Sequence, residues 1–397
     1  MREDFYNYQA QTTPRPLALE VARAEGVYIY DTQGHSFLDF TAGISANPLG
    51  YGHPKVVEAV KAQTEKYMHV MVYGEYIQEP AVQLAKLLAR HLPQPLQTTY
   101  LVNSGAEAVE GALKLAKKVT GRTQLIAAHF AYHGNTQGAM SVMGYEERKQ
   151  AFRPLMPGIG FIHFNNDKDL ELITEKTAAV ILETIQGGAG FIVPGKTYLK
   201  KVHKRCREVG ALLILDEIQS GFGRTGRLFG FQHYRVVPDI LVMGKGMGGG
   251  MPIGAFTASH SMMAALKDKP ALGHITTFGG HPVIAAAALS TLKEITETSL
   301  MEEIAEKEHL FRTLLVHPLI KEIRGMGLML ALIVEQDEIA NYLINKALER
   351  KLILFWLLFE PKAVRITPPL TISEEAIKEG CAIILEILEG WKSEDVN

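Results

Sequence analysis

The stretch "LLILDEIQSGFGRTGRLFGF", residues 212–231, changes from an uninterrupted apolar run to a glycine-rich loop, and the change falls at two carboxylates, Asp216 and Glu217. An apolar run without polar alternation is typical of a strand covered on both faces. The preceding segment, "KTYLKKVHKRCREVG" (196–210), has helical spacing of its apolar residues and follows a second apolar run, "AAVILE" (178–183). The region therefore predicts a strand–helix–strand unit whose second strand ends at the two carboxylates.

The same alternation continues in both directions along the chain. Further strands are predicted at 98–102, 123–128, 238–245 and 253–259, and a helix at 104–121. This order predicts an α/β fold with a mostly parallel sheet and helices on both faces. Short β-like pieces fill the first fifty residues, and long helices (282–297, 302–318) with short strands follow Phe278. We expect a large α/β domain and a smaller α+β domain; the ranges are 1–50 (N-terminal part of the small domain), 51–284 (large domain) and 285–397 (C-terminal small domain).

Composition limits the classes of function. Of the 397 residues, 47% are hydrophobic and 21% charged, and the formal net charge is −2. Such a chain has no electrostatic argument for binding nucleic acid or an anionic membrane surface. Two cysteines cannot build a disulfide framework, the first residues lack a signal-peptide core, and the most apolar stretch (352–359) is too short to cross a bilayer. We expect a cytoplasmic enzyme with a cleft between domains, because the size suits one.

Polar or glycine residues follow four of the predicted strands. They are "NSGAEA" after 102, "HFAYHG" after 128, "DEIQ" after 215 and "GKGMGGG" after 243. In open α/β sheets, ligands bind outside the carboxyl ends of the strands. The four segments are therefore predicted to meet at one edge of the sheet.

The first of these segments has two interpretations. Ser104, Gly105 and Ala106 stand at a strand-to-helix turn, where small residues and free N–H groups can hold a phosphate. Ser104 followed by Glu107 is also an ordinary capping box. Taken alone, the pattern favours the cap.

The fourth segment carries a lysine and a competing motif. Gly244, Gly246 and Gly249 fit the dinucleotide fingerprint, which makes an NAD-dependent dehydrogenase a second hypothesis, although further glycines and Pro252 make a poor helix start. Lys245 is either a surface lysine or a nucleophile with little side chain around it. A buried lysine with a lowered pKa forms a Schiff base with an aldehyde, and a buried carboxylate such as Asp216 needs a cationic partner. A lysine and an aspartate beneath a pyridinium nitrogen are the pair that pyridoxal phosphate requires.

Longer motifs carry a family resemblance. Residues 212–256, "NSGAEAVEGALKLAKKVTGR" (103–122), "AYHGNTQGAMS" (131–141), "ITTFGGHP" (275–282) and "VRITPPL" (364–370) resemble, in order, the class III aminotransferases, which are pyridoxal-phosphate enzymes of fold type I. The resemblance covers nearly the whole chain and is greatest to the acetylornithine/ornithine aminotransferases. It implies transamination between an amino acid or ω-amine and a 2-oxo acid.

The resemblance also assigns roles to residues. Lys245 is expected to hold the cofactor and to move the substrate proton, and Asp216 to pair with the ring nitrogen. Thr276 and Thr277 fall in a segment that reaches the phosphate from a partner subunit, which implies a homodimer with shared active sites. The remaining expected cofactor contacts are Ser104, Gly105, Ala106, Tyr132, His133, Glu183, Ile218 and Gln219.

Two substitutions separate this chain from that subgroup. Asn135 stands where the subgroup has an arginine that receives a substrate carboxylate, and Gly188 stands where a glutamate switches off a downstream arginine, here Arg365. Asparagine cannot form the bidentate fork of an arginine. The substrate site is therefore expected to include Asn135, Gly188, Thr276 and Arg365, with Arg365 always available.

Several alternatives stay open on the sequence. The segment after Tyr132 also resembles diaminononanoate aminotransferases, and some class III members are racemases. A non-enzymatic binding module would not need Lys245 together with Asp216. His129 and His133 have a spacing used by zinc ligands, but no third ligand accompanies them, so no metal site is expected.

Overall fold

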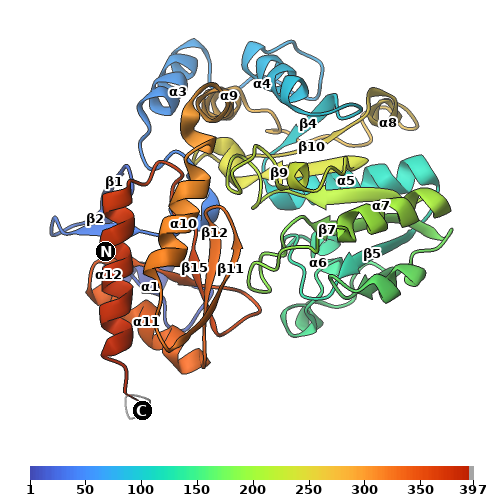
Figure 1. Cartoon of the computed structure of the whole chain (residues 1–397). Helices are drawn as coiled ribbons and strands as arrows, with labels where there is room; N and C mark the ends of the chain where they lie inside the picture. The colour runs from blue at the N-terminus through green and yellow to red at the C-terminus, as the bar shows by residue number, and fades with distance from the viewer. Residues whose placement is uncertain (393–397) are drawn as a thin grey trace.

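The computed structural model describes residues 1–392 and is built around a seven-stranded sheet (Figure 1). Across the sheet the strands are β4 (Thr98–Val102), β10 (Gly254–Ala258), β9 (Ile240–Gly244), β8 (Leu212–Asp216), β7 (Thr177–Glu183), β5 (Gln124–Ala128) and β6 (Ile159–Ile162). Only β10 is antiparallel to its neighbours, β4 and β9; the other pairs are parallel. The mostly parallel sheet is confirmed, and six strands point their carboxyl ends toward one edge.

Apolar side chains of the central strands pack on both faces of the sheet. Val180 and Leu182 of β7 share a cluster with Leu199 of α7 (Tyr198–Val209). Their neighbour Ile181 belongs to a second cluster, with Ala112 of α5 (Gly105–Thr120). This double coverage is why the strand sequences show no polar alternation.

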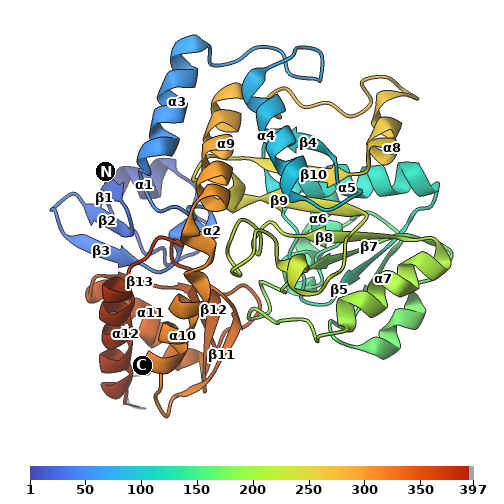
Figure 2. The same cartoon turned by 45° about the horizontal axis from the view of Figure 1, so that its top comes forward.

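Two smaller sheets join the ends of the chain. The first has the order β1 (Val21–Glu25), β2 (Tyr28–Asp31), β3 (Ser36–Asp39) and β13 (Leu352–Ile353), with β3 and β13 parallel. The second is antiparallel, in the order β11 (Ile320–Met326), β12 (Met329–Val334), β15 (Ala363–Ile366) and β14 (Phe355–Trp356). In both views the blue N-terminal strands and the red C-terminal helix α12 (Glu374–Glu389) lie on the same side of the central sheet (Figures 1 and 2). The domain boundaries at 50/51 and 284/285 stay a prediction.

Helices complete the molecule. Three helices pack together at one end of the sheet: α3 (Pro54–Lys66), α4 (Glu79–His91) and α9 (Pro282–Glu297). Two more lie by the C-terminal strands: α10 (Ile304–Leu314) and α11 (Asp337–Glu349). Shorter helices are α1 (Arg2–Tyr8), α2 (Ala42–Ser45), α6 (Gln137–Ser141) and α8 (His260–Met263). The helix predicted to reach residue 318 ends at Leu314. Pro318 disfavours the helical conformation of the residue before it, so the helix ends upstream of that residue. Within residues 1–392 no helix is long and apolar enough to span a membrane.

The segment after β9 rules out the dinucleotide fingerprint. Residues 245–248 form a 3-10 turn, η5 (Lys245–Gly248), and the chain then enters β10. A dinucleotide site needs an α-helix whose N-terminus faces the pyrophosphate. The three glycines therefore lack the structural context of that motif.

Candidate active site

A cavity of about 500 Å³ opens at the carboxyl edge of the central sheet, next to β14 and β15. It collects residues from the ends of β5, β7, β8 and β9, from the start of α5, and from the 355–365 segment. The expected site residues that line it are Gly105, Ala106, Tyr132, His133, Asn135, Glu183, Gly188, Asp216, Ile218, Gln219, Lys245 and Arg365. The four strand-end segments thus meet at one place, as the sequence predicted.

Asp216 is held by two hydrogen bonds at the end of β8. Its Oδ2 lies 2.7 Å from His133 Nδ1, and its Oδ1 accepts from the backbone N–H of Ile218 at 2.9 Å. Burial alone would lower the pKa of His133, but the hydrogen bond to Asp216 and its negative charge outweigh burial and raise this pKa. Asp216 therefore favours the protonated form of the His133 imidazole.

Glu183, at the end of the adjacent strand β7, is a second buried carboxylate. Its oxygens accept backbone N–H bonds from Tyr132 at 3.1 Å and from Gly187 at 2.9 Å. Burial raises the pKa of Glu183 to about 7, with the nearby charge of Asp216 acting in the same direction. Glu183 thereby fixes the loop that carries Tyr132.

Glu217 faces away from the cavity and organises the glycine-rich loop. Its four hydrogen-bond donors are the hydroxyls of Thr184 and Ser220 (2.6 Å each) and the backbone N–H groups of Gly230 (2.9 Å) and Phe231 (2.7 Å). The carboxylate is fully buried and its oxygens are satisfied. The two adjacent carboxylates of the opening stretch therefore have different roles, because Asp216 faces the cavity and Glu217 holds the loop.

Lys245 lies directly after β9, in a left-handed backbone conformation (φ 43°). This conformation is unfavourable for a residue with a Cβ and often marks a functional position. Burial lowers the pKa of Lys245, while the charge of Asp216 opposes this shift. Lysine, aspartate and histidine thus line one cavity.

Arg365 on β15 is almost completely buried, at 4% exposure, yet its Nε and Nη1 have no hydrogen-bond partner. Its guanidinium lies 5.3 Å from the centre of the Phe191 ring. Burial lowers the pKa of Arg365 to about 10. A buried guanidinium with unused donors is a ready receptor for a carboxylate.

Three expected residues do not line this cavity. Ser104 caps α5 by accepting the N–H of Glu107 (3.2 Å), while Glu107 bonds Asn103 and not the cap residue, so the predicted capping box is only half formed. Thr276 accepts from Asn103 Nδ2 at 2.8 Å, and Thr277 is exposed. Ser104 thus acts as a cap here, and the two threonines are not brought to the cavity of their own subunit.

Several lining residues were not expected from the sequence: Ile44, Gly134, Ile185, Ser220, Phe355, Trp356 and Leu358. Three of them, Phe355, Trp356 and Leu358, belong to the apolar run 352–359. The length of this run excludes a membrane span, but nothing in its pattern indicates that it lines a cavity.

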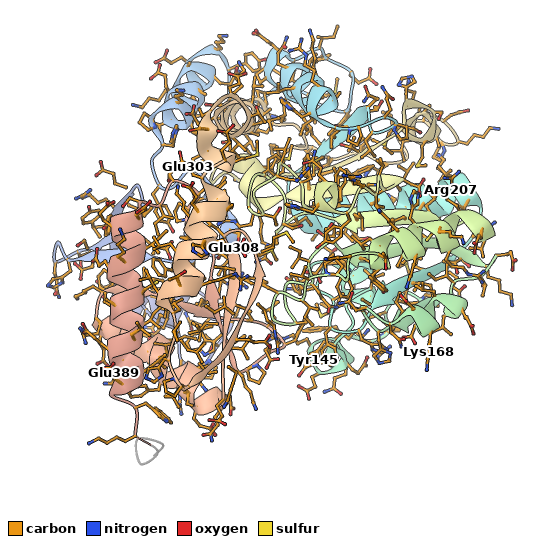
Figure 3. All side chains as sticks on the ribbon, viewed as in Figure 1. Tyr145, Lys168, Arg207, Glu303, Glu308 and Glu389 are labelled. Carbon is orange, nitrogen blue, oxygen red and sulfur yellow. The ribbon has the colours of Figure 1, made fainter. Side chains whose placement is uncertain are left out.

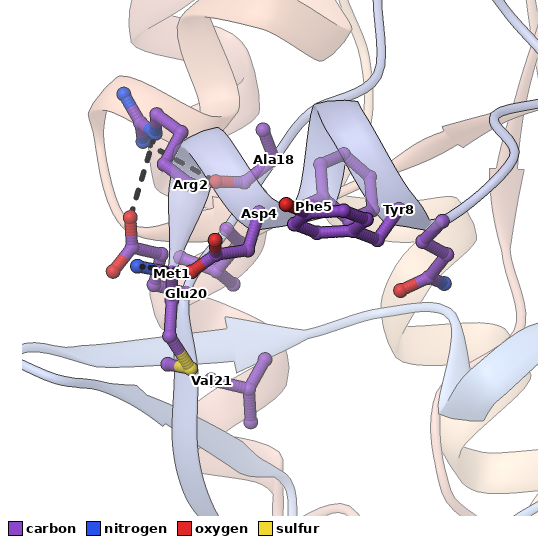
Figure 4. Close-up of a pocket in the computed structure, with 10 residues that line it drawn as sticks. Met1, Arg2, Asp4, Phe5, Tyr8, Ala18, Glu20 and Val21 are labelled. Carbon is purple, nitrogen blue, oxygen red and sulfur yellow. Dashed lines mark hydrogen bonds and ion pairs between the residues drawn. The ribbon is translucent and has the colours of Figure 1, made fainter.

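A second cavity, of about 430 Å³, lies beside α1 and the start of β1. Arg2 forms an ion pair with Glu20 there (3.5 Å), and the rings of Phe5 and Tyr8 lie alongside (Figure 4). No lysine, histidine or cysteine is among its lining residues within 1–392. Its lining residues within 1–392 therefore include no lysine side chain that could form a Schiff base with an aldehyde cofactor.

The mostly parallel central sheet, with smaller sheets built from both ends of the chain, is the fold of solved transaminase structures, which is fold type I of the pyridoxal-phosphate-dependent enzymes. The class III aminotransferase family model matches residues 8–388. The chain belongs to this family and is an aminotransferase with pyridoxal phosphate as its cofactor.

Individual relatives agree with this family. An acetylornithine aminotransferase of Caldanaerobacter subterraneus subsp. tengcongensis is 38% identical over 93% of this chain and 94% of its own. A putrescine aminotransferase of Pectobacterium atrosepticum is 39% identical over 90% of this chain and 79% of its own. The crystal structure of ornithine aminotransferase from Toxoplasma gondii ME49 has a TM-score of 0.91 at 30% identity, covering 98% of this chain and 95% of that one.

Proposed function

We propose that this aminotransferase takes an amino group from an amino acid or ω-amine and gives it to a 2-oxo acid whose carboxylate binds Arg365. The observation that carries the proposal is the convergence of Lys245, Asp216 and an unpartnered Arg365 on one cavity. Transamination needs an amine for proton transfer, an anion beside the nitrogen of the cofactor ring, and a cation for the substrate carboxylate.

The residues around the cavity fit pyridoxal phosphate. Gly105 and Ala106 occupy the first positions of α5, where helical N–H groups lack intrahelical partners and favour a phosphate. A Cβ on Gly105 would lie 2.7 Å from Ile218 Cδ1, so glycine allows the close approach of backbone and Ile218. The buried Nε2 atoms of His133 and Gln219 have no partner in the protein. We assign the phosphate to Gly105 and Ala106, and the ring to Tyr132, Ile218 and Gln219.

The bound cofactor supplies an electron sink for the carbon that loses its proton. Lys245 holds the cofactor and then moves a proton at the reacting carbon of the substrate, a role suited to an amine whose pKa is lowered by burial. Asp216 supplies the negative charge for the ring nitrogen. His133, whose Nδ1 lies 2.7 Å from Asp216 Oδ2, holds that carboxylate in place.

The identity of the donor rests on relatives. Proteins named acetylornithine aminotransferase are 35–38% identical to this chain, and one named putrescine aminotransferase is 39% identical. N-acetylornithine is therefore the first donor to test, followed by ornithine and putrescine. A diaminononanoate-type activity or amino-acid racemisation remains the second candidate, because Asn135 replaces the arginine of the acetylornithine pattern.

We also propose that the enzyme is a homodimer with shared sites and works in the cytoplasm. The position of Thr277, exposed and away from the cavity of its own subunit, supports a role at the site of a partner subunit. The net charge of −2 is compatible with the cytoplasm.

The deciding experiment is a donor and acceptor panel on the purified holoenzyme and on Asn135→Arg. We expect conversion of at least one amine with a 2-oxo acid, and a lower KM for 2-oxoglutarate in Asn135→Arg. Formation of the opposite enantiomer of the amino acid without any acceptor, and without net amino transfer, would instead identify a racemase. Wild type that already uses 2-oxoglutarate at low KM, with no gain in Asn135→Arg, would mean that the distal carboxylate is bound elsewhere.

A further inference from the structure

One wall of the active-site cavity is apolar. Phe355 and Leu358 form it, with Ile44 and Ile185 also lining the cavity, whereas the side chain of Trp356 lies on the other face of β14, with Val364. The indole Nε1 of Trp356 donates to Asn341 Oδ1 on α11 at 2.7 Å, so its single polar group is already used outside the cavity. A substrate group against this wall meets hydrocarbon and no hydrogen-bond donor from these side chains.

Cationic groups in the cavity are few, and most are already engaged. Among its lining residues within 1–392 they are His133, Lys245 and Arg365. His133 is bonded to Asp216, and Lys245 is assigned to the cofactor. Arg365 alone remains for a substrate carboxylate.

The wall is fixed in place by the 187–190 loop. The N–H of Phe359 donates to the carbonyl of Gly188 at 2.9 Å, and a Cβ on Gly188 would lie 2.7 Å from the Phe359 ring. That ring stacks on Tyr145 with centroids 4.7 Å apart. Tyr145 is labelled in Figure 3 where the central part of the chain meets the C-terminal part. No side chain at position 188 can project into this space without moving Phe359.

Arg148 is the nearest rival receptor, but its position argues against that role. Its Nη2 donates to the carbonyl of Leu358 at 3.1 Å, and its guanidinium lies 5.7 Å from the Phe359 ring centre. It is exposed and does not line the cavity. Arg148 therefore positions the 355–359 segment from outside.

We propose that the acceptor is a 2-oxo acid with one carboxylate and an apolar side chain, and that its product is the matching α-amino acid. The inference rests on the proposed function. Arg365 binds the carboxylate beside the reacting carbon, and the side chain packs on Phe355, which pairs with Arg365 across β14 and β15, and on Leu358. The acceptor C2=O becomes a C2–H carrying the amino group, while the donor amine carbon becomes C=O, so the exchange is balanced. A second carboxylate against the apolar wall would lose its water without gaining a partner.

The test compares 4-methyl-2-oxopentanoate with 2-oxoglutarate, which differ chiefly in an apolar or anionic distal group. Enzyme loaded with pyridoxamine phosphate makes the measurement independent of the donor, since the cofactor spectrum follows the acceptor half-reaction. We expect the rate constant per unit concentration to be at least about tenfold higher for the apolar acid. Equal use of both acids, or preference for 2-oxoglutarate, overturns the inference.

Paired variants at Leu358 test the wall itself, and the 36% exposure of this side chain makes polar replacements tolerable for folding. Leu358→Arg should raise the rate with 2-oxoglutarate, and Leu358→Gln, the neutral control, should lower the rate with the apolar acid without that gain. Identical behaviour of the two variants toward 2-oxoglutarate would show that the distal group does not meet this wall.

A binding measurement separates this inference from the proposed function. Calorimetric titration of the holoenzyme with 4-methylpentanoate and with glutarate, neither of which can react, should give tighter binding of 4-methylpentanoate. If no amine and no 2-oxo acid is converted, the proposed function fails, while this titration still decides whether the site prefers an apolar monocarboxylate to a dicarboxylate. If conversion occurs but glutarate binds more tightly, only the inference fails.

Discussion

Three acidic side chains at the ends of β7 and β8 lie close together, and their partners give them different roles. Asp216 is paired with His133, Glu183 accepts two backbone N–H groups, and Glu217 accepts four donors. Burial raises the pKa of Glu183 and of Glu217, and the hydrogen bonds that they accept oppose this shift. Substitution of single residues should therefore have separable effects on catalysis and stability.

Lys245→Ala should remove the visible absorbance of the lysine-linked cofactor and lower turnover by at least about a thousandfold. The amine is both the covalent attachment point and the proposed proton carrier. Absorbance spectra and steady-state rates of the purified variant measure both effects. Normal absorbance and activity in Lys245→Ala would refute the assignment of the site.

Asp216→Asn should keep the fold but lower kcat by more than about tenfold, which corresponds to about 1.4 kcal/mol of barrier per decade. The amide of asparagine keeps the size of the side chain at the end of β8 but removes the negative charge proposed to face the ring nitrogen. The cofactor spectrum should shift, and circular dichroism should remain that of wild type. A loss smaller than about tenfold would mean that another residue partners the ring.

Glu183 should make the stability of the cofactor-free protein depend on pH. Its pKa is raised from 4.5 to about 7, so the folded state holds a proton that the unfolded chain releases at lower pH. Its contribution is fully present below pH 4.5 and is lost as pH rises through about 7. The upper bound of this loss is about 3 kcal/mol.

Denaturant unfolding from about pH 4.5 to about pH 8 would measure this contribution. Glu183→Gln should flatten the profile, and Glu171→Gln, at an exposed position, should leave it unchanged. Parallel profiles for wild type and Glu183→Gln would contradict the expected role.

Among the elements, the contact between the 187–190 loop and the 355–359 segment is the most sensitive to a small change. Gly188→Ala would bring a methyl group within 2.7 Å of the Phe359 ring, which is held by Tyr145 and by the backbone bond to Gly188. We expect the free energy of unfolding to fall by about 1–3 kcal/mol.

The control for Gly188→Ala is Gly195→Ala, because a Cβ there meets only Asn165 Oδ1 at 3.8 Å. A double mutant with Phe359→Leu should recover part of the loss, since the smaller side chain makes room. Additive effects of the two substitutions would show that Phe359 is not the obstacle.

For the whole molecule, the division of the site between two chains is the main proposal. Thr277→Glu should disable the site of the partner subunit by repelling the cofactor phosphate. Mixing it with Lys245→Ala under subunit exchange would leave one intact site in each hybrid dimer. Activity should then recover to about a quarter of wild type.

The matching control mixes Lys245→Ala with Asp216→Ala, whose hybrids have no intact site because both residues serve the cavity of their own chain. Analytical ultracentrifugation would confirm that dimers form in each mixture. Failure of the Thr277→Glu mixture to recover, with dimers present, would mean that Thr277 does not act on the site of the partner subunit.

Local patterns in the sequence predicted six of the seven strands of the central sheet and the positions of Asp216 and Lys245 at strand ends. Apolar runs ending in "DE" and "GK" predicted β8 and β9, because strands buried on both faces are nearly continuous apolar runs. Asp216 and Lys245 were expected at one edge of the sheet, because the carboxyl ends of parallel strands lie at the same edge. The short edge strand β6, which contains Gly160, was not predicted, since a half-buried strand with a glycine has little apolar signal.

Only the tertiary structure decided which distant groups became partners. It joined His133 to Asp216, left the donors of Arg365 unused, and put Phe359 where a side chain at position 188 would go. It also brought Phe355 and Leu358 from an apolar run to the wall of the cavity. The spacing of residue types along the chain shows only the periodicity within one helix or strand. These contacts depend on how different helices and strands pack against one another, and that packing is determined by the whole core.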